Sequence, residues 1–271
     1  MAWARMDRAV EVINTGDELL DGRVLNTNGQ WIARRCSTRG LSVRRITVVG
    51  DRLEDIASAL REALGREPAL VIVTGGLGPT PDDVTARAVA EALDVPLALD
   101  ERALKMVEGF FKRLGQEMTP SREKMAWMPE GSQPLENPRG AAPGFLIQHG
   151  RTKVVVLPGV PEEMEAMFEL HVEPILDELA RDLTRYEARF LVFGLRESDL
   201  APALDEVLRS VPGIYVKTHP RAEEERYYLE LFVAVVSSSS SEAREKMARA
   251  VMALSEHISA LGGSMMPYAP K

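Results

Sequence analysis

The stretch Val71-Ile-Val-Thr-Gly-Gly-Leu-Gly-Pro-Thr-Pro-Asp-Asp-Val-Thr85 decides how this chain folds. Its first three residues are apolar and β-branched, a composition typical of a buried strand. The strand ends at a glycine loop, Gly75 to Gly78, and a helical pattern resumes at about Val84. Glycines let the backbone approach a ligand closely, and a helix N-terminus offers unpaired N–H groups and a positive dipole end. The stretch therefore predicts an α/β fold with a phosphate-binding loop.

Two carboxylates, Asp82 and Asp83, follow the glycines in the same loop. Acids beside a phosphate are expected where a cation lies between them, or where they take part in a reaction. The alternative is structural, because either aspartate can cap the helix that begins at about Val84. The first interpretation gives the pair a chemical role, and the second gives it none.

Two earlier strands end in similar polar residues. The strand Ala9–Asn14 runs into Thr15-Gly-Asp-Glu18, and the strand Val43–Val49 closes at Gly50-Asp51. Helical periodicity over Leu53–Leu64 indicates a crossover between parallel strands, and right-handed crossovers place the strand ends on one edge of the sheet. We therefore expect three polar strand ends to meet in one cleft, where open α/β sheets bind ligands.

The segment Asn26-Thr-Asn28 has two interpretations. Any of its three residues can cap the following helix, predicted over Gln30–Arg39. Its position near the expected cleft equally allows contact with a ligand. Both interpretations stay open on sequence alone.

A second strand–glycine–helix junction occurs later in the chain. A hairpin of Phe145–Gln148 and Lys153–Leu157 is predicted to lead into Leu157-Pro-Gly-Val-Pro161, with proline at the start of a helix. Glu162 and Glu163 then fall in the first helical turn, where acids complement the dipole. Contact with a ligand is the alternative role for these two acids.

A smaller domain is predicted after the charged stretch Arg181–Arg185. Residues 186–262 show a β-α-β-β-α pattern, which is typical of a compact α+β domain, whereas residues 1–180 form the larger one. The small domain has no glycine loop, so we expect it to serve packing or oligomerisation. We predict an exposed hairpin tip at 221–226 and a frayed tail at 263–271.

Composition limits the classes of function. The chain has 271 residues with 45% apolar and 27% charged, which describes an ordinary globular protein. A net charge of −8 argues against nonspecific binding to nucleic acid or an anionic membrane, and no stretch approaches the ~18 apolar residues that a membrane span needs. The single cysteine, Cys36, fits a reducing cytoplasm and is predicted to be a buried thiol. Four scattered histidines indicate no zinc site.

These motifs resemble a known family. The string Thr74-Gly-Gly-x-Gly-Pro79-x-x-Asp82-Asp-Val-Thr85 is similar to the signature of the MoaB/Mog molybdopterin-binding domain superfamily. Within it, the chain resembles most closely the competence/damage-inducible CinA family, because it also contains Asn14-Thr-Gly-Asp-Glu-Leu-Leu20, Val24-Leu-Asn-Thr-Asn28, Val48-Val-Gly-Asp51, Asn137-Pro and Leu157-Pro-Gly-x-Pro161. The match runs in order from about residue 9 to residue 180. The β-α-β-β-α segment resembles the small KH-like domain of that family.

The resemblance implies a three-layer α/β sandwich followed by the small KH-like α+β domain. The superfamily binds the phosphate and pterin of molybdopterin, and CinA proteins are similar to a metal-dependent ADP-ribose pyrophosphatase. The resemblance implies catalytic roles for Asp51, Asp82 and Asp83, with a divalent ion (Mg, Mn or Co) held by Asp82 and Asp83. It implies phosphate or substrate binding by Thr15, Gly16, Glu18, Asn26, Asn28, Thr74, Gly75, Gly76, Gly78, Thr80, Asn137, Gly140, Pro158 and Gly159.

Three functions follow as hypotheses. The first is a metal-dependent pyrophosphatase acting on ADP-ribose or a related nucleoside diphosphate compound. The second is a molybdopterin-binding module without hydrolase activity, and the third is a structural or regulatory protein. Asp17 and Pro81 stand at variable positions where the family often has Thr and Lys respectively, so we expect this extra acid and missing cation to alter substrate preference and turnover. We expect a homodimer, no nucleic-acid or membrane partner, and no nicotinamide-mononucleotide deamidase activity because the chain ends at Lys271.

Overall fold

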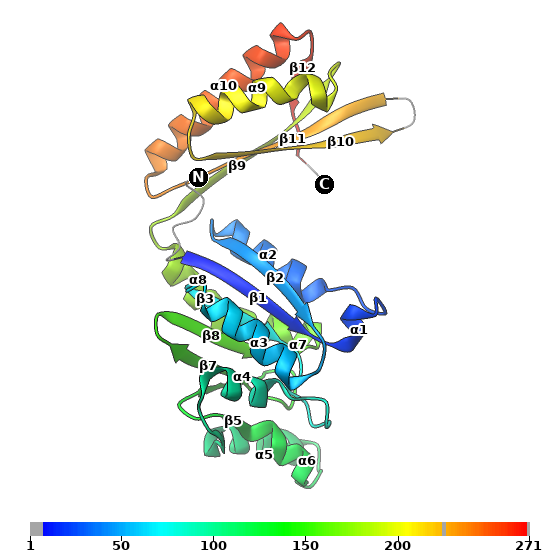
Figure 1. The fold of residues 1–271 in the computed structure, drawn as a ribbon, viewed down its shortest axis with the longest axis vertical. Coiled ribbons are helices and arrows are strands. Elements are labelled where there is room, and N and C mark those ends of the chain that lie inside the picture. Colours follow the sequence, from blue (N-terminus) through cyan, green and yellow to red (C-terminus); the bar gives the residue numbers. More distant parts are fainter. Residues whose placement is uncertain (1–7, 224–225, 270–271) are drawn as a thin grey trace. The chain divides into compact units, whose positions relative to one another are not determined.

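Figure 1 shows the computed structural model, which describes residues 8–223 and 226–269. Contacts divide the chain into two units, one ending at Leu179 and the other beginning at Ala180. Each unit is built around a hydrophobic core of its own. No helix in these two ranges is both long and apolar enough to cross a membrane.

A six-stranded mixed sheet forms the centre of the first unit, in the order β2-β1-β3-β8-β7-β6. Its middle strands are buried along their whole length, as their apolar runs predict. The first four strands in this order are parallel, and the last two are antiparallel. The strands are β1 (Ala9–Thr15), β2 (Ser42–Val49), β3 (Leu70–Thr74), β8 (Thr152–Leu157), β7 (Gly144–His149) and β6 (Gln133–Leu135).

Helices cover both faces of this sheet, so the predicted three-layer sandwich is confirmed (Figure 1). One face contributes Ile13, Val71 and Val73 to a core shared with α3 (Leu53–Leu64), α4 (Thr85–Leu93) and α5 (Glu101–Arg113). Alternate side chains point to the opposite face. That face carries α2 (Thr27–Thr38), α7 (Pro161–Met167) and α8 (Glu173–Ala180).

The helices of the second face are held together by charge and by aromatic packing. Arg35 of α2 and Arg39, the C-cap residue of the same helix, both pair with Glu173 at the start of α8. The ring of Trp31 packs edge-on against Phe168, with 4.9 Å between the ring centroids. Cys36 is buried on the same helix, and burial raises the pKa of its thiol to about 12, which confirms the predicted buried thiol.

The sequence missed a two-stranded ribbon beside α4. It consists of β4 (Leu97–Leu99) and β5 (Trp127–Pro129), which pair antiparallel. Three residues give too short a run to show an alternating pattern, so neither strand is visible without its partner. The short helix α6 (Pro120–Glu123) precedes β5, and α1 (Asp17–Leu20) follows β1.

The second unit folds into an antiparallel sheet with two helices. Its elements are β9 (Thr184–Phe193), α9 (Glu197–Ser210), β10 (Ile214–Glu223), β11 (Arg226–Ser237), α10 (Ser240–Ala260) and β12 (Ser264–Pro267). The predicted β-α-β-β-α order is confirmed and is extended by one strand. The sheet order is β10-β11-β9-β12, and the element order is that of the split-βαβ motif.

The expectation of a frayed tail is wrong for β12. Ser264 to Pro267 pair with β9, from Phe193 to Phe190, and Met265 packs against the core. Four residues ending in proline carry no strand signal of their own, and pairing with an edge of the sheet orders them. The predicted hairpin tip also begins later, because β10 runs to Glu223; residues 224–225 lie outside the described residues.

A buried ion pair joins β1 to the end of α3. Glu11 is 2% exposed, and Arg66 donates to both of its carboxylate oxygens, with Nε–Oε1 at 2.8 Å and Nη2–Oε2 at 2.7 Å. A carboxylate in the middle of a sheet is costly unless it is paired and hydrogen-bonded. The fold therefore depends on Arg66 to keep Glu11 where it is.

We predict that Arg66→Ala lowers the free energy of unfolding by about 3 kcal/mol, because it leaves the Glu11 charge buried and unpaired. Urea unfolding followed by Trp31 fluorescence measures the change. The matched control is Arg61→Ala, which removes an exposed pair with Glu91 at 3.9 Å and should change stability by less than about 0.5 kcal/mol. Equal losses in the two variants would contradict the prediction.

Candidate functional site: an acidic cleft at the glycine loop

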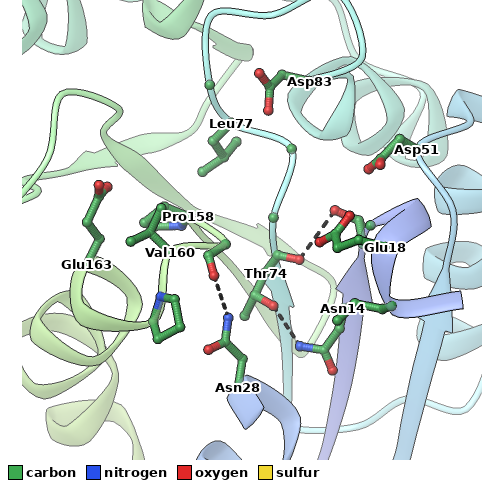
Figure 2. Close-up of a pocket in the computed structure, with 18 of the residues that line it drawn as sticks. Asn14, Glu18, Asn28, Asp51, Thr74, Leu77, Asp83, Pro158, Val160 and Glu163 are labelled. Carbon is green, nitrogen blue, oxygen red and sulfur yellow. Dashed lines mark hydrogen bonds between the residues drawn. The ribbon is translucent and has the colours of Figure 1, made fainter. Parts of the chain in front are cut away.

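A cleft of about 600 Å³ lies where the carboxyl ends of the parallel strands meet. The strand ends of β1, β2, β3 and β8 all contribute to it, so the predicted convergence is confirmed (Figure 2). The residues predicted as site residues that line it are Thr15, Gly16, Glu18, Asn26, Asn28, Asp51, Thr74, Gly75, Gly76, Gly78, Asp82, Asp83, Pro158 and Gly159.

The glycine loop follows a path that only glycine allows. Gly75 and Gly76 have φ angles of +105° and +63°, which side chains disfavour. A Cβ on Gly75 would lie 2.7 Å from the carbonyl oxygen of Thr15, and one on Gly76 would collide with the hydroxyl of Thr85. Backbone hydrogen bonds fix both ends, from Gly75 to Leu157 and from Thr85 to Gly76. The loop is thus held tightly against the ends of β1 and β8.

The two aspartates of the loop do not cap α4. The N-cap of this helix is Val84, with no side-chain cap, so the capping alternative is wrong. Asp83 Oδ2 instead accepts hydrogen bonds from the N–H of Thr80 at 2.8 Å and from its hydroxyl at 2.6 Å. The same hydroxyl also lies against Asp82, and one hydroxyl proton cannot serve both carboxylates. Asp82 and Asp83 line the cleft, whereas Thr80 lies behind them.

The loops after β1 and β2 are locked by a reciprocal pair of hydrogen bonds. The Asp17 N–H donates to Asp51 Oδ2 at 3.0 Å, and the Asp51 N–H donates to Asp17 Oδ1 at 3.2 Å. Burial raises the pKa of Asp51, although the bond from Asp17 lowers it, and the nearby charges of Asp17, Glu18 and Asp82 raise it further. Asp51 is therefore the acid of the cleft whose negative charge is disfavoured by its surroundings.

Asn26 and Asn28 have different roles. Asn26 is the N-cap of α2, because its Oδ1 accepts from the Gly29 N–H at 2.9 Å, and its amide also donates to Asn14. Asn28 donates to the Gly159 carbonyl at 2.8 Å, and its buried Oδ1 has no protein partner (Figure 2). A buried acceptor without a partner is uncommon, and less than 1 Å² of Asn28 Oδ1 is accessible, so the bond to Gly159 is the contact that defines the role of Asn28.

Glu163 is the acid that the sequence did not place among the site residues. It lies on the opposite side of the cleft from Glu18 and Asp51 (Figure 2). Asn137 Nδ2 donates to its carboxylate at 2.7 Å, and Gly140 leaves the space into which that carboxylate fits. The sequence did predict a helix start at Pro161, which puts Glu163 in the first helical turn. Interaction with the helix dipole already accounts for an acid in that turn, so the pattern did not mark Glu163 as a site residue.

Asn137 and Gly140, predicted as substrate-binding residues, do not line the cleft. Asn137 holds its own loop by donating to the Ala142 carbonyl and by accepting from the N–H groups of Arg139 and Gly140. Both residues lie against the Glu163 side chain, Asn137 through a hydrogen bond and Gly140 through the space it leaves. The Asn-Pro motif is thus a support for an acidic side chain.

The charge of the cleft is one-sided. Five acids line it: Glu18, Asp51, Asp82, Asp83 and Glu163. Within the described part of the chain, its lining contains no Lys, Arg or His. In residues 8–223 and 226–269, no group of three or more His, Cys, Asp or Glu side chains is placed to hold a metal ion by itself. Mg²⁺ commonly uses only one or two carboxylates together with substrate phosphates. The donor set fits such an ion when the ligand itself supplies oxygens.

Comparison with known proteins places the chain in a family. A family model described as "Probable molybdopterin binding domain" matches residues 11–178. The chain belongs to this family. A protein of Pyrobaculum aerophilum is 46% identical over 240 residues, covering 88% of this chain and 90% of the relative. A protein of Aeropyrum pernix is 44% identical over 255 residues, covering 94% and 95%.

A solved member of the family supports the resemblance to CinA. It is the protein CinA of unknown function from Thermoplasma acidophilum, with 43% identity and a TM-score of 0.58. The comparison covers 62% of this chain and 98% of that one. The resemblance of the first unit to the molybdopterin-binding domain family and to CinA is therefore confirmed.

We predict that Asp51→Asn raises the melting temperature at pH 7. The folded-state pKa of Asp51 lies above its ordinary value of 3.8, so ionisation on raising the pH costs folding free energy, and the amide removes that cost. Asn still offers an oxygen to the Asp17 N–H. The gain should shrink as the pH falls toward 3.8, and thermal melts at several pH values measure it.

Asp21 supplies a control of opposite sign. Its pKa is lowered, first by the Arg23 N–H, so it stabilises the fold above its ordinary pKa and loses that contribution as the pH falls. Asp21→Asn should give no gain at pH 7. A gain for Asp51→Asn that does not change with pH would contradict the electrostatic explanation.

Proposed function

We propose that the cleft binds and hydrolyses a nucleoside diphosphate compound such as ADP-ribose, with a divalent metal ion as cofactor. The observation that carries the proposal is the charge of the cleft. Among the described residues, five acids and no Lys, Arg or His line it beside a phosphate-type glycine loop. A diphosphate would be repelled by these acids alone. A divalent ion between the two turns the repulsion into attraction, and the acids then have a purpose.

The residues divide the work in this proposal. The glycine loop offers backbone to the phosphates, since no side chain stands in the way. Asp82 and Asp83 would hold the ion, which would supply charge neutralisation and a more acidic water. Asp51 would accept a proton from the attacking water, because its raised pKa lies closer to neutrality than that of an ordinary aspartate.

The second candidate function is binding of molybdopterin or another phosphorylated pterin without hydrolysis. The match of the family model over most of the first unit favours it. The cleft suits such a ligand as well, because the Glu163 carboxylate would accept hydrogen bonds from the N–H groups of a pterin edge.

We predict release of AMP and ribose 5-phosphate from ADP-ribose in the presence of Mg²⁺, Mn²⁺ or Co²⁺, and none after chelation by EDTA. Asp83→Asn should reduce kcat/KM by at least about tenfold, because it weakens the hold on the ion. Asp205→Asn, an exposed position on α9, is the matched control and should leave the rate unchanged. No AMP from the wild-type protein with any of the three metals would end the hydrolase proposal.

A thermal-shift assay separates the two candidates. A non-hydrolysed ADP-ribose analogue with Mg²⁺ should raise the melting temperature if the first holds, since ligands that bind only the folded state stabilise it. Stabilisation by molybdopterin but not by the analogue favours the second. Melting curves with Mn²⁺ and no organic ligand test whether the ion binds by itself. Asp83→Asn should reduce the rise in melting temperature that Mn²⁺ causes.

A further inference from the structure

A second hollow, of about 300 Å³, adjoins the acidic cleft along the glycine loop. The two share five lining residues: Gly76, Leu77, Gly78, Asp83 and Met125. A ligand with a phosphate at the loop can therefore extend from one hollow into the other. We call the second hollow the Trp127 pocket.

The Trp127 pocket is chemically unlike the cleft. Its two cations are Lys124 and Arg87. The rest of its wall is mainly apolar and aromatic and includes Leu97, Trp127, Met128, Phe145, Pro81, Pro120 and Pro143. Three prolines lack N–H groups, so these parts of the wall offer few polar atoms. The charged residues of the cleft are all acids, whereas the pocket has two cations and aromatic surface beside the shared Asp83.

The β4–β5 ribbon places Trp127 in this pocket. Trp127 pairs with Leu99 across the ribbon, and the next residue, Met128, is 2% exposed and belongs to the core. Trp127 keeps 39% of its surface exposed. A large indole left half open beside a hollow is a surface on which a flat ring can stack.

The charges of the pocket are arranged around the loop. Lys124 donates from Nζ to the Thr80 carbonyl, so the ammonium lies against the loop that carries Asp82 and Asp83. Arg87 is exposed in the first turns of α4. Both cations line the pocket beside the glycine loop.

We propose that the Trp127 pocket binds the planar heteroaromatic ring of the ligand whose phosphate lies at the glycine loop. The ring stacks on Trp127, and Lys124 and Arg87 face its polar edge. The volume of about 300 Å³ lies at the lower end of the range for ligand pockets, about 300–1,000 Å³, so it suits a single ring system. The phosphate end rests on the proposed function; the ring site does not require hydrolysis.

Adenine and pterin are both planar heteroaromatic rings with polar edges, so a binding experiment decides which of the two the pocket takes. The reporter is the fluorescence of Trp127 in a protein carrying Trp3→Phe and Trp31→Phe, titrated with AMP, neopterin phosphate and ribose 5-phosphate in Mg²⁺. The two ring compounds should quench Trp127, and ribose 5-phosphate should not. The ring that binds more tightly identifies the ligand class. No quenching by either ring compound would overturn the proposal.

Calorimetry on Trp127 variants gives the second measurement. Trp127→Ala should weaken binding of the ring compound on the order of tenfold, the usual size of a lost stacking contact, and Trp127→Phe should retain most of the affinity. Affinity for ribose 5-phosphate should not change. The exposed aromatic control, Tyr215→Ala in the second unit, should have no effect, and melting curves confirm that each variant folds.

The outcomes separate this proposal from the hydrolase. Full affinity of Trp127→Ala for ADP-ribose would overturn the ring site and leave hydrolysis standing. Quenching of Trp127 by AMP without any turnover of ADP-ribose would support the ring site and overturn the hydrolase proposal.

Discussion

The close passage of the glycine loop over the ends of β1 and β8 is the constraint on which the site depends. Gly75 is bonded to Leu157, and Gly76 lies so near the hydroxyl of Thr85 that no Cβ fits between them. Because the loop is pressed down in this way, its backbone forms the floor of the cleft. Asp82 and Asp83, which follow it, are brought up beside the strand ends that carry Glu18 and Asp51. A side chain at either glycine would lift the loop and separate these groups.

The acids that this constraint gathers repel one another, and the structure shows the cost at Asp51. Its pKa is raised by burial and by three neighbouring carboxylates. The Thr80 hydroxyl relieves only one of Asp82 and Asp83 at a time. Groups held together at such a cost are typical of functional sites rather than of stabilising networks. A bound cation would remove the cost, and this physical reason links the acids to the glycine loop.

The sequence predicted the parts of this arrangement that follow from local pattern and from handedness. Buried strands, crossover helices and the meeting of their polar ends could be derived because parallel strands share a carboxyl edge. Contacts between distant loops could not. The hydrogen bond between Asn137 and Glu163 joins residues that are 26 positions apart in the sequence. Asn137, predicted to bind the ligand, holds the Glu163 side chain in the structure, and Glu163 was not predicted as a site residue. The β12 strand was missed for the same reason: only its pairing with β9 orders it.

This division also explains why the motifs indicate phosphate but not substrate. In the proposed function, the glycines and the aspartates would contact what diphosphates and pterin phosphates have in common, a charged oxygen cluster. Two groups that could distinguish the two ligands lie outside the motifs: Glu163 in the cleft and Trp127 in the adjoining pocket. Tertiary packing brings these two residues to the site, and their spacing in the sequence carries no signal. The walls around the glycine loop, rather than the loop itself, are therefore where the determinants of ligand specificity should be sought.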